Sequence, residues 1–305
     1  MQGITSFLQA TLRLATPTLL ASLGIVFSER AGIVNIGTEG MMLIGALAGV
    51  MGSYYTGSVI LGTLIAMLVT VLFVSIFGFF TVIIKADQTV IGTGMNILAA
   101  GLTITANRAV FGASTSPPSI DVFDSWRIPL LADIPVIGPA LFNQPIPVYL
   151  AFLFVPIAGF IMFRTNTGLK LRAVGENPRA CDTVGISVTK VRFLAVLYSG
   201  VLAGFAGAFV SMGQMSFFTE GIISGGGFMA VAAVVFGNYT PRGVMFSSLV
   251  FGAAYALMPR IQAASMGIPG QFILMLPYLI TIIALCLVIR RSNRPTSSAV
   301  PYIKE

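Results

Sequence analysis

The residues of this sequence best suited to chemistry are polar side chains that stand inside apolar stretches. Asn35, Glu39 and Asn96 each lie in a segment that is otherwise apolar or rich in glycine. Such groups are costly inside a membrane and usually face a water-filled cavity or a polar partner. A carboxylate and two amides can hydrogen-bond the hydroxyl groups and ring edges of a small polar solute. We therefore expect these three residues to line a translocation path; the alternative is structural pairing with other buried polar side chains.

Catalytic and metal-binding chemistry finds little support. The chain contains no histidine and two cysteines, Cys181 and Cys286, so a Cys/His metal site has no ligand set. It offers no convincing pair of nucleophile and base, and the nucleotide-binding pattern G-x-x-x-x-G-K-[ST] does not occur. We expect a chain that is not an enzyme, uses no cofactor or metal, and depends on another chain for any ATP hydrolysis.

The composition indicates that Asn35, Glu39 and Asn96 belong to a membrane protein. Of the 305 residues, 56% are hydrophobic and 9% are charged, whereas soluble globular chains carry about 25% charged residues. Residues 58–84 include no charge at all, and a transmembrane helix needs about 20 mostly apolar residues. The sequence therefore predicts an all-α integral membrane protein. Its net charge of +7 does not indicate nucleic-acid binding, because the basic residues stand at the ends of apolar segments.

Nine apolar segments predict nine transmembrane helices in one domain over residues 1–290, followed by a tail over residues 291–305. The segments cover residues 4–27, 31–52, 58–84, 88–112, 147–163, 192–212, 225–240, 243–259 and 270–289. Glycines interrupt the second and the seventh, and glycine weakens a helix by about 1 kcal/mol relative to alanine. Broken helices in corresponding places of two halves indicate a substrate path. Close helix packing through small residues is the alternative.

The charges between the segments predict the orientation. Residues 164–192 carry six basic and two acidic residues, whereas residues 113–146 carry three acidic residues and one basic residue. Because Lys and Arg are enriched in cytoplasmic loops, we expect 164–192 to be cytoplasmic and 113–146 to be an external loop. The tail, with Arg291 and Arg294, is then cytoplasmic, and nine crossings leave the N-terminus outside.

Residues 175–185 of the predicted cytoplasmic loop are predicted to form one short helix with clear end signals. Asn177 suits the N-cap, Pro178 the first helical position, and Gly185 the left-handed residue that ends a helix. Two helical turns are unstable alone in water. We therefore expect this helix to dock, either on a partner or on this protein's own cytoplasmic surface.

Three segments together resemble one family of membrane proteins. They are GLKLRAVGENP at 168–178, SERAGIVNIGTEGMM at 28–42 and GGFMAVAAVVFG at 226–237. They are similar to the permease subunits of ABC importers for ribose, branched-chain amino acids and nucleosides, and the resemblance extends over nearly the whole chain. Sugar-transporting relatives tend to read Ile-Asp-Leu-Ser-Val-Gly at 33–38. The Asn-Ile-Gly-x-Glu-Gly version found here is more like the nucleoside branch.

The resemblance implies a function, partners and coupling residues. It implies a permease subunit of an ATP-driven importer that moves nucleosides or similar small polar solutes across the inner membrane. Its partners would be a second homologous permease subunit in a heterodimer, a cytoplasmic ATPase, an external binding protein or lipoprotein, and membrane lipid. In that family the short cytoplasmic helix enters a groove of the ATPase. The residues implied in this coupling are Gly175, Glu176, Asn177, Pro178, Arg179 and Asp182.

Two other functions stay open. A self-sufficient secondary transporter would also contain broken helices at mid-membrane, and Glu39 would then carry a coupling proton. The short capped helix favours the importer, because a secondary carrier has no reason to present one to the cytoplasm. The same importer role with a sugar or an amino acid as substrate is also compatible with the sequence.

Overall fold

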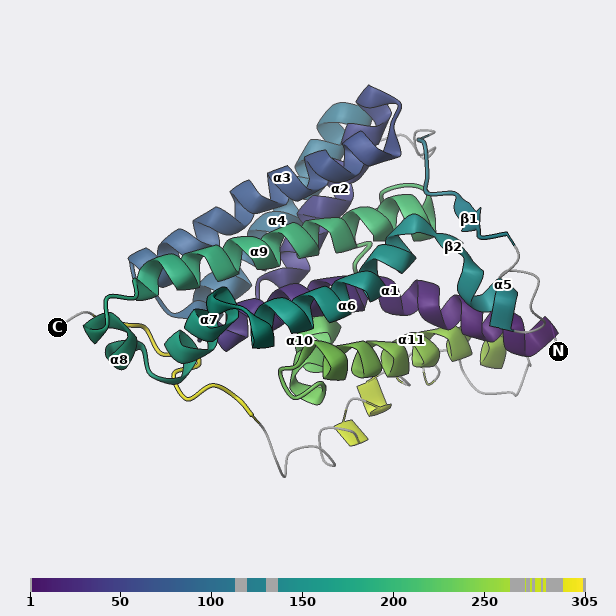
Figure 1. The fold of residues 1–305 in the computed structure, drawn as a ribbon. Helices are drawn as coiled ribbons and strands as arrows, with labels where there is room; N and C mark the ends of the chain where they lie inside the picture. The colour runs from purple at the N-terminus through teal and green to yellow at the C-terminus, as the bar shows by residue number, and fades with distance from the viewer. Residues whose placement is uncertain are drawn as a thin grey trace.

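Helix α1 (Gln2–Arg30) runs through the middle of a bundle of roughly aligned helices (Figure 1). The computed structural model describes residues 2–112, 120–129, 137–263 and 293–303, with isolated positions between 272 and 283. α1 contacts helices from both halves of the chain, among them α6, α9, α10 and α11. Residues 15–29 of α1 are buried, because these neighbours surround it. The centre of the bundle is therefore a helix and not a sheet or a pore.

Six helices within the described residues are long and apolar enough to cross a membrane. They are α1, α3 (Val59–Gly78, continued by a π-helical turn over Phe79–Ile83), α4 (Gln88–Phe111), α6 (Ile146–Arg164), α9 (Val188–Phe209, continued by a π-helical turn over Val210–Met215) and α11 (Pro241–Ala263). Helix α2 (Thr38–Thr56) is as long as α6 but begins with a polar turn. This arrangement agrees with the predicted all-α membrane fold.

One small element departs from the all-α prediction. Strand β1 (Ser125–Arg127) pairs antiparallel with β2 (Asn143–Pro145), and the short helix α5 (Ile137–Phe142) precedes β2. In the register of the pair, Trp126 stands opposite Gln144. The expected external loop, 113–146, thus includes an ordered hairpin-like pair, and the rest of that loop lies partly outside the described residues.

The second and seventh expected spans differ from the structure. α1 ends at Arg30 and α2 begins only at Thr38, with Gly32 in the left-handed region at φ +90° between them. A continuous second span over 31–52 would have put Asn35 and Glu39 one turn apart on one helix face, but Asn35 lies in the break before α2 and Glu39 lies within α2. α10 (Gly226–Phe236) has 11 residues, or about 16 Å of helix, about half the apolar thickness of a membrane. The ninth segment, 270–289, lies mostly outside the described residues.

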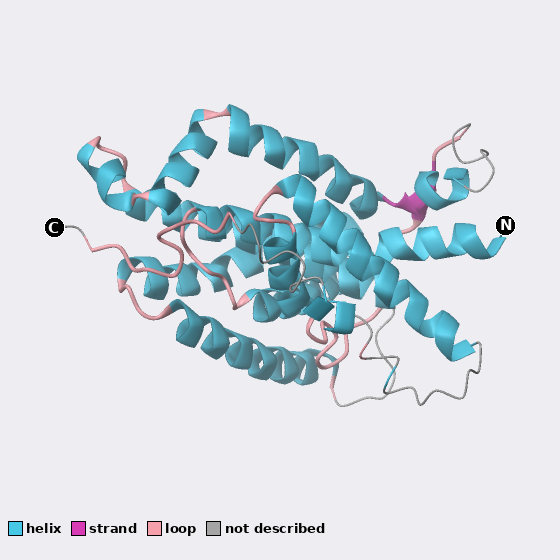
Figure 2. Cartoon of the chain, turned by 90° about the horizontal axis from the view of Figure 1, so that it is seen from below, coloured by secondary structure: helices cyan, strands magenta, loops and turns pink. Residues whose placement is uncertain are grey.

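The two ends of the bundle carry different elements. At one end lie α7 (Asn166–Glu176), α8 (Pro178–Thr183) and residues 293–303, which we call the tail segment. At the other end lie the N-terminus, β1, β2 and α5 (Figures 1 and 2). At that N-terminal end the Arg260 guanidinium donates hydrogen bonds to Gly3 O at 2.8 Å and to Ser6 Oγ at 2.7 Å. The chain termini thus mark opposite ends of the bundle.

Small residues bring α2, α3 and α9 into close contact. A Cβ on Gly45 of α2 would lie 2.7 Å from Gly204 Cα of α9, which is closer than real Cβ atoms come. Gly200 of α9 likewise meets Val74 of α3. For Gly45, a glycine of the second expected span, the packing alternative is correct, because the missing side chain allows the two backbones to approach.

Candidate functional site

Two helix N-termini meet at Glu39. The carboxylate accepts a hydrogen bond from Gly225 N to Oε1 at 2.9 Å and another from Gly227 N to Oε2 at 2.7 Å. Glu39 itself stands in the first turn of α2, and the two amides open α10. A helix N-terminus carries unpaired N–H groups and a partial positive charge. One carboxylate therefore satisfies the start of α10 and lies within the positive end of α2, and we call this place the helix junction.

The two helices extend in opposite directions from the junction. The end of α2 packs against the end of α4, where the rings of Tyr54 and Phe111 have centroids 5.2 Å apart. α10 instead ends beside the end of α1, where Arg30 Nε donates to Tyr239 O at 2.9 Å. The junction therefore lies inside the bundle and not at either of its ends.

Asn96 of α4 holds the start of α2. Its Oδ1 accepts from Gly40 N at 2.8 Å, and its Nδ2 donates to Ile36 O at 3.1 Å. The N-cap of α2 is Gly37, which has no side chain for this task, so Asn96 replaces the missing cap from a neighbouring helix. Asn96 is eight residues beyond Gln88 at the start of α4, or about 12 Å along it. The junction therefore lies beside the interior of α4, a helix long and apolar enough to cross a membrane.

Asn35 is fully buried beside the same break. Its Nδ2 donates to Ser199 Oγ of α9 at 3.0 Å and to Met41 Sδ at 3.3 Å. Its Oδ1 is buried without a hydrogen-bond partner among the described residues. The structure thus brings Asn35, Glu39 and Asn96 together around the start of α2. It also gives each of them protein partners, which are backbone groups for Glu39 and Asn96 and side chains for Asn35.

The short helix in the α6–α9 connection has the predicted end signals. Asn177 Oδ1 accepts from Ala180 N at 3.1 Å, Pro178 opens α8, and Gly185 has φ +82° just beyond it. The predicted start was too early, however. Gly175 and Glu176 belong to α7, because its helical hydrogen bonding continues to Asn177 N, which donates to Ala173 O at 2.9 Å.

α8 has a buried and an exposed side. Cys181 packs with Val174 and Val188 in a small apolar core, and this burial raises the pKa of its thiol. Ala180 is exposed, and Val184 is 72% exposed. Between α7 and α8 lies a groove of about 600 Å³. It is lined by Asn166, Leu169, Lys170, Ala173, Glu176, Asn177, Ala180, Cys181, Val184 and Ile186.

The tail segment docks on this loop, a feature that the sequence analysis missed. Ser297 N donates to Gly175 O at 3.0 Å, and Thr296 Oγ1 donates to Glu176 Oε2 at 2.8 Å. Further along, Ala299 N donates to Gly32 O at 3.1 Å, in the break between α1 and α2. The tail segment therefore joins the end of α7 to the segment that leads into the helix junction.

Arg192 is a second residue that sequence reasoning missed. It lies in α9 and is 2% exposed. Its Nε donates to Ala31 O at 3.0 Å and its Nη1 to Val300 O at 2.9 Å. In the sequence it is a basic residue at the start of an apolar segment, a position that the cytoplasmic bias of Arg explains equally well. Only its burial distinguishes it from the other basic residues of the loop.

Comparison with known proteins gives the family. The family model described as "Branched-chain amino acid transport system / permease component" matches residues 7–285. The guanosine ABC transporter permease protein NupQ of Bacillus subtilis is 39% identical over 316 residues, which cover 100% of this chain and 98% of NupQ. The nucleoside ABC transporter permease protein NupC of Lactococcus lactis is 39% identical over 303 residues, covering 95% of this chain and 94% of NupC.

A relative from another substrate class is nearly as similar. TsgC13 of Haloferax volcanii, provisionally named a glucose ABC transporter permease protein, is 36% identical over 272 residues, covering 88% of this chain and 81% of TsgC13. No solved structure matches the chain significantly. The matches include both the helix junction and the α7–α8 loop, and they decide against an enzyme and against a self-sufficient secondary transporter. The chain belongs to the family of permease components of branched-chain amino acid transport systems.

Proposed function

We propose that this protein is the nucleoside-translocating permease subunit of an ATP-binding-cassette importer of the inner membrane. The substrate assignment rests on the 39% identity, over nearly the full length of both chains, to permeases named for guanosine and for nucleosides. The role in translocation is supported by the helix junction, where two helices begin at membrane depth in this proposal. Irregular backbone at this depth is tolerated where it is buried in protein or lines a cavity.

In this proposal the translocated nucleoside moves along a path beside the helix junction. Discontinuous helices of transporters direct their N-terminal ends at substrate groups. Asn35 supplies a carbonyl oxygen without a partner among the described residues, and Glu39 and Asn96 are only partly buried. The hydroxyl groups and base edge of a nucleoside pair with such groups when the importer changes conformation. Glu39 thereby both holds α10 and borders the path.

The α7–α8 loop is the docking site of the ATPase in this proposal. The groove between the two helices offers an apolar floor, and Arg179 and Asp182 on α8 set the register of the partner. Gly175, Glu176, Asn177 and Pro178 hold α8 in place, the first two through the tail segment and the last two through the cap. The loop over 164–192 and the tail are then cytoplasmic, and the N-terminus is external.

The remaining parts of the proposal concern assembly. Residues 1–290 form one transmembrane domain with nine crossings, the ninth over 270–289. A second homologous permease completes the pore as a heterodimer, and an external binding protein or lipoprotein delivers the solute. The family membership and the six long apolar helices support this architecture.

An uptake experiment tests the substrate. Cells that lack this chain but retain its partners should lose uptake of radiolabelled guanosine, and a plasmid copy of the chain should restore it. Unlabelled uridine or adenosine should compete, whereas glucose and leucine should not. A strain with an inactive partner ATPase is the matched control and should lose the same uptake. If glucose uptake is lost and guanosine uptake is not, the substrate is a sugar, as the similarity to TsgC13 would then have indicated.

A further inference from the structure

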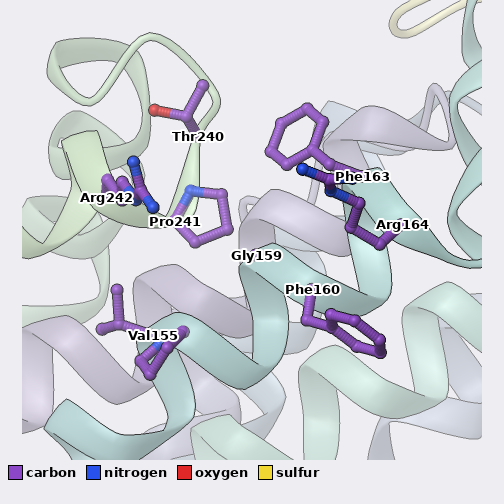
Figure 3. Close-up of a pocket in the computed structure, with 9 residues that line it drawn as sticks. Val155, Gly159, Phe160, Phe163, Arg164, Thr240, Pro241 and Arg242 are labelled. Atoms are coloured by element: carbon purple, nitrogen blue, oxygen red, sulfur yellow. The ribbon is translucent and has the colours of Figure 1, made fainter.

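A cavity separate from the α7–α8 groove lies between α6 and the start of α11, away from the helix junction. Its volume is about 580 Å³. It is lined by Val155, Pro156, Gly159, Phe160, Phe163 and Arg164 of α6 and by Thr240, Pro241 and Arg242. Figure 3 shows Pro241 and Arg242 on one side of it and Phe163 and Arg164 on the other, with Val155 and Phe160 further along α6.

The mouth of this cavity is positively charged. Arg164 and Arg242 are exposed, and neither guanidinium forms a hydrogen bond or an ion pair with another described residue. None of the nine lining residues is acidic. A third guanidinium stands close by, since Arg172 Cζ lies 5.2 Å from the centroid of the Phe163 ring. The mouth therefore attracts an anionic group and contains no carboxylate to neutralise it.

The floor of the cavity is apolar and extends into the membrane. From Arg164 to Val155 the lining follows α6 over nine residues, or about 14 Å. Phe160 on this floor is 63% exposed, and, apart from the neighbouring backbone of α6 itself, no described atom lies within 4 Å of the position that a Cβ on Gly159 would take. A free anion would occupy only the charged mouth. A molecule with an anionic head and a hydrocarbon chain would fill both parts.

We propose that this cavity binds an anionic phospholipid, with its phosphate between Arg164 and Arg242 and an acyl chain along Val155 and Gly159. The proposal rests on the orientation given above, which puts this end of the bundle at the cytoplasmic leaflet. Basic pockets between transmembrane helices on that side attract anionic headgroups. α6 continues through Thr165 directly into α7. A lipid bound here braces the base of the α7–α8 loop against α11.

The test measures lipid retained by the purified importer and does not depend on transport. The whole complex is placed in nanodiscs that contain phosphatidylglycerol and phosphatidylcholine, delipidated gently, and its retained lipids are quantified by mass spectrometry. Each basic residue near an anionic headgroup contributes about fivefold to binding. The R164Q/R242Q variant should therefore lose about 25-fold of the preference for phosphatidylglycerol. The K85Q/K190Q variant removes the same charge from exposed positions outside the cavity and should keep the preference.

A second pair of variants tests the apolar floor. Gly159→Leu fills the open space and should reduce retained phosphatidylglycerol, whereas Gly159→Ala should not. The proposal is overturned if R164Q/R242Q keeps the preference, or if K85Q/K190Q loses as much. Displacement of the lipid by inorganic phosphate at millimolar concentration would show a simple anion site instead. Loss of the ATPase from R164Q/R242Q with unchanged lipid would show a protein contact. Retained lipid with no guanosine uptake by wild type would contradict only the proposed substrate.

Discussion

Replacing Glu39 should weaken the helix junction by an amount that its hydrogen bonds predict. Glu39→Ala leaves Gly225 N and Gly227 N without their acceptor. A buried polar group left unpaired costs about 1–3 kcal/mol. Both hydrogen bonds are only part-buried, so this variant should lose roughly 2 kcal/mol of folding free energy, the low end of the range for two groups. Glu39→Gln keeps one acceptor oxygen and turns an amide NH2 toward the other N–H donor. It should therefore lose about 1 kcal/mol, the low end of the range for one group.

The assay is thermal unfolding of the purified importer, together with membrane abundance and guanosine uptake. We expect the order wild type, Glu39→Gln, Glu39→Ala in both stability and uptake. Glu220→Gln is the matched control, because it makes the same chemical change in an exposed ion pair with Arg108, and such pairs contribute about 0–1 kcal/mol. Wild-type stability of Glu39→Gln would refute the reasoning from the two hydrogen bonds. Wild-type uptake by both variants would remove Glu39 from the path.

Three further predictions concern the α7–α8 loop, the tail segment and the orientation of the chain. Arg179→Glu reverses a charge beside the proposed ATPase groove and should lower uptake several-fold at normal membrane abundance; normal uptake with normal co-purification of the ATPase would contradict the docking site. Arg192→Met keeps the apolar stem but removes the hydrogen bonds to the tail segment and to the α1–α2 break, so limited proteolysis should cut the tail faster, and an unchanged digestion pattern would be evidence against this role. A cysteine at Tyr55, an exposed residue in the last turn of α2, should react with an impermeant thiol reagent in intact cells, whereas one at Thr189 should react only after permeabilisation; the reverse pattern would invert the proposed orientation.

The long apolar helices were predictable because each is encoded by its own composition. The segment expected over 58–84 became Val59–Ile83, and the one expected over 88–112 became Gln88–Phe111. In such segments the absence of charge and the required length of about 20 residues leave little freedom. The start of α2 was not predictable in this way. It depends on Asn96, more than fifty residues away in the chain, which supplies the cap that Gly37 lacks.

The α7–α8 loop shows the same division between local and distant causes. Asn177, Pro178 and Gly185 act on their own neighbours, so their roles follow from the sequence. Gly175 and Glu176 were assigned to the ATPase contact from the resemblance alone. In the structure both hydrogen-bond to the tail segment, and the partner of Glu176 is Thr296, at a sequence separation of 120 residues. No local pattern encodes such a contact, and the tail looks like an ordinary polar C-terminus in the sequence.

These distant contacts form one continuous connection from the α7–α8 loop to the helix junction. Gly175 O is held by Ser297 N, and Gly32 O is held by Ala299 N two residues later in the same tail segment. From Gly32 the chain continues through Asn35 to α2, whose start depends on Asn96. A partner that displaces the end of α7 must therefore either carry Gly32 with it or break these backbone hydrogen bonds. Both outcomes alter the segment from which α2 begins. The tail segment thus belongs physically to the connection between the α7–α8 loop and the helix junction, although it lies outside the proposed transmembrane domain.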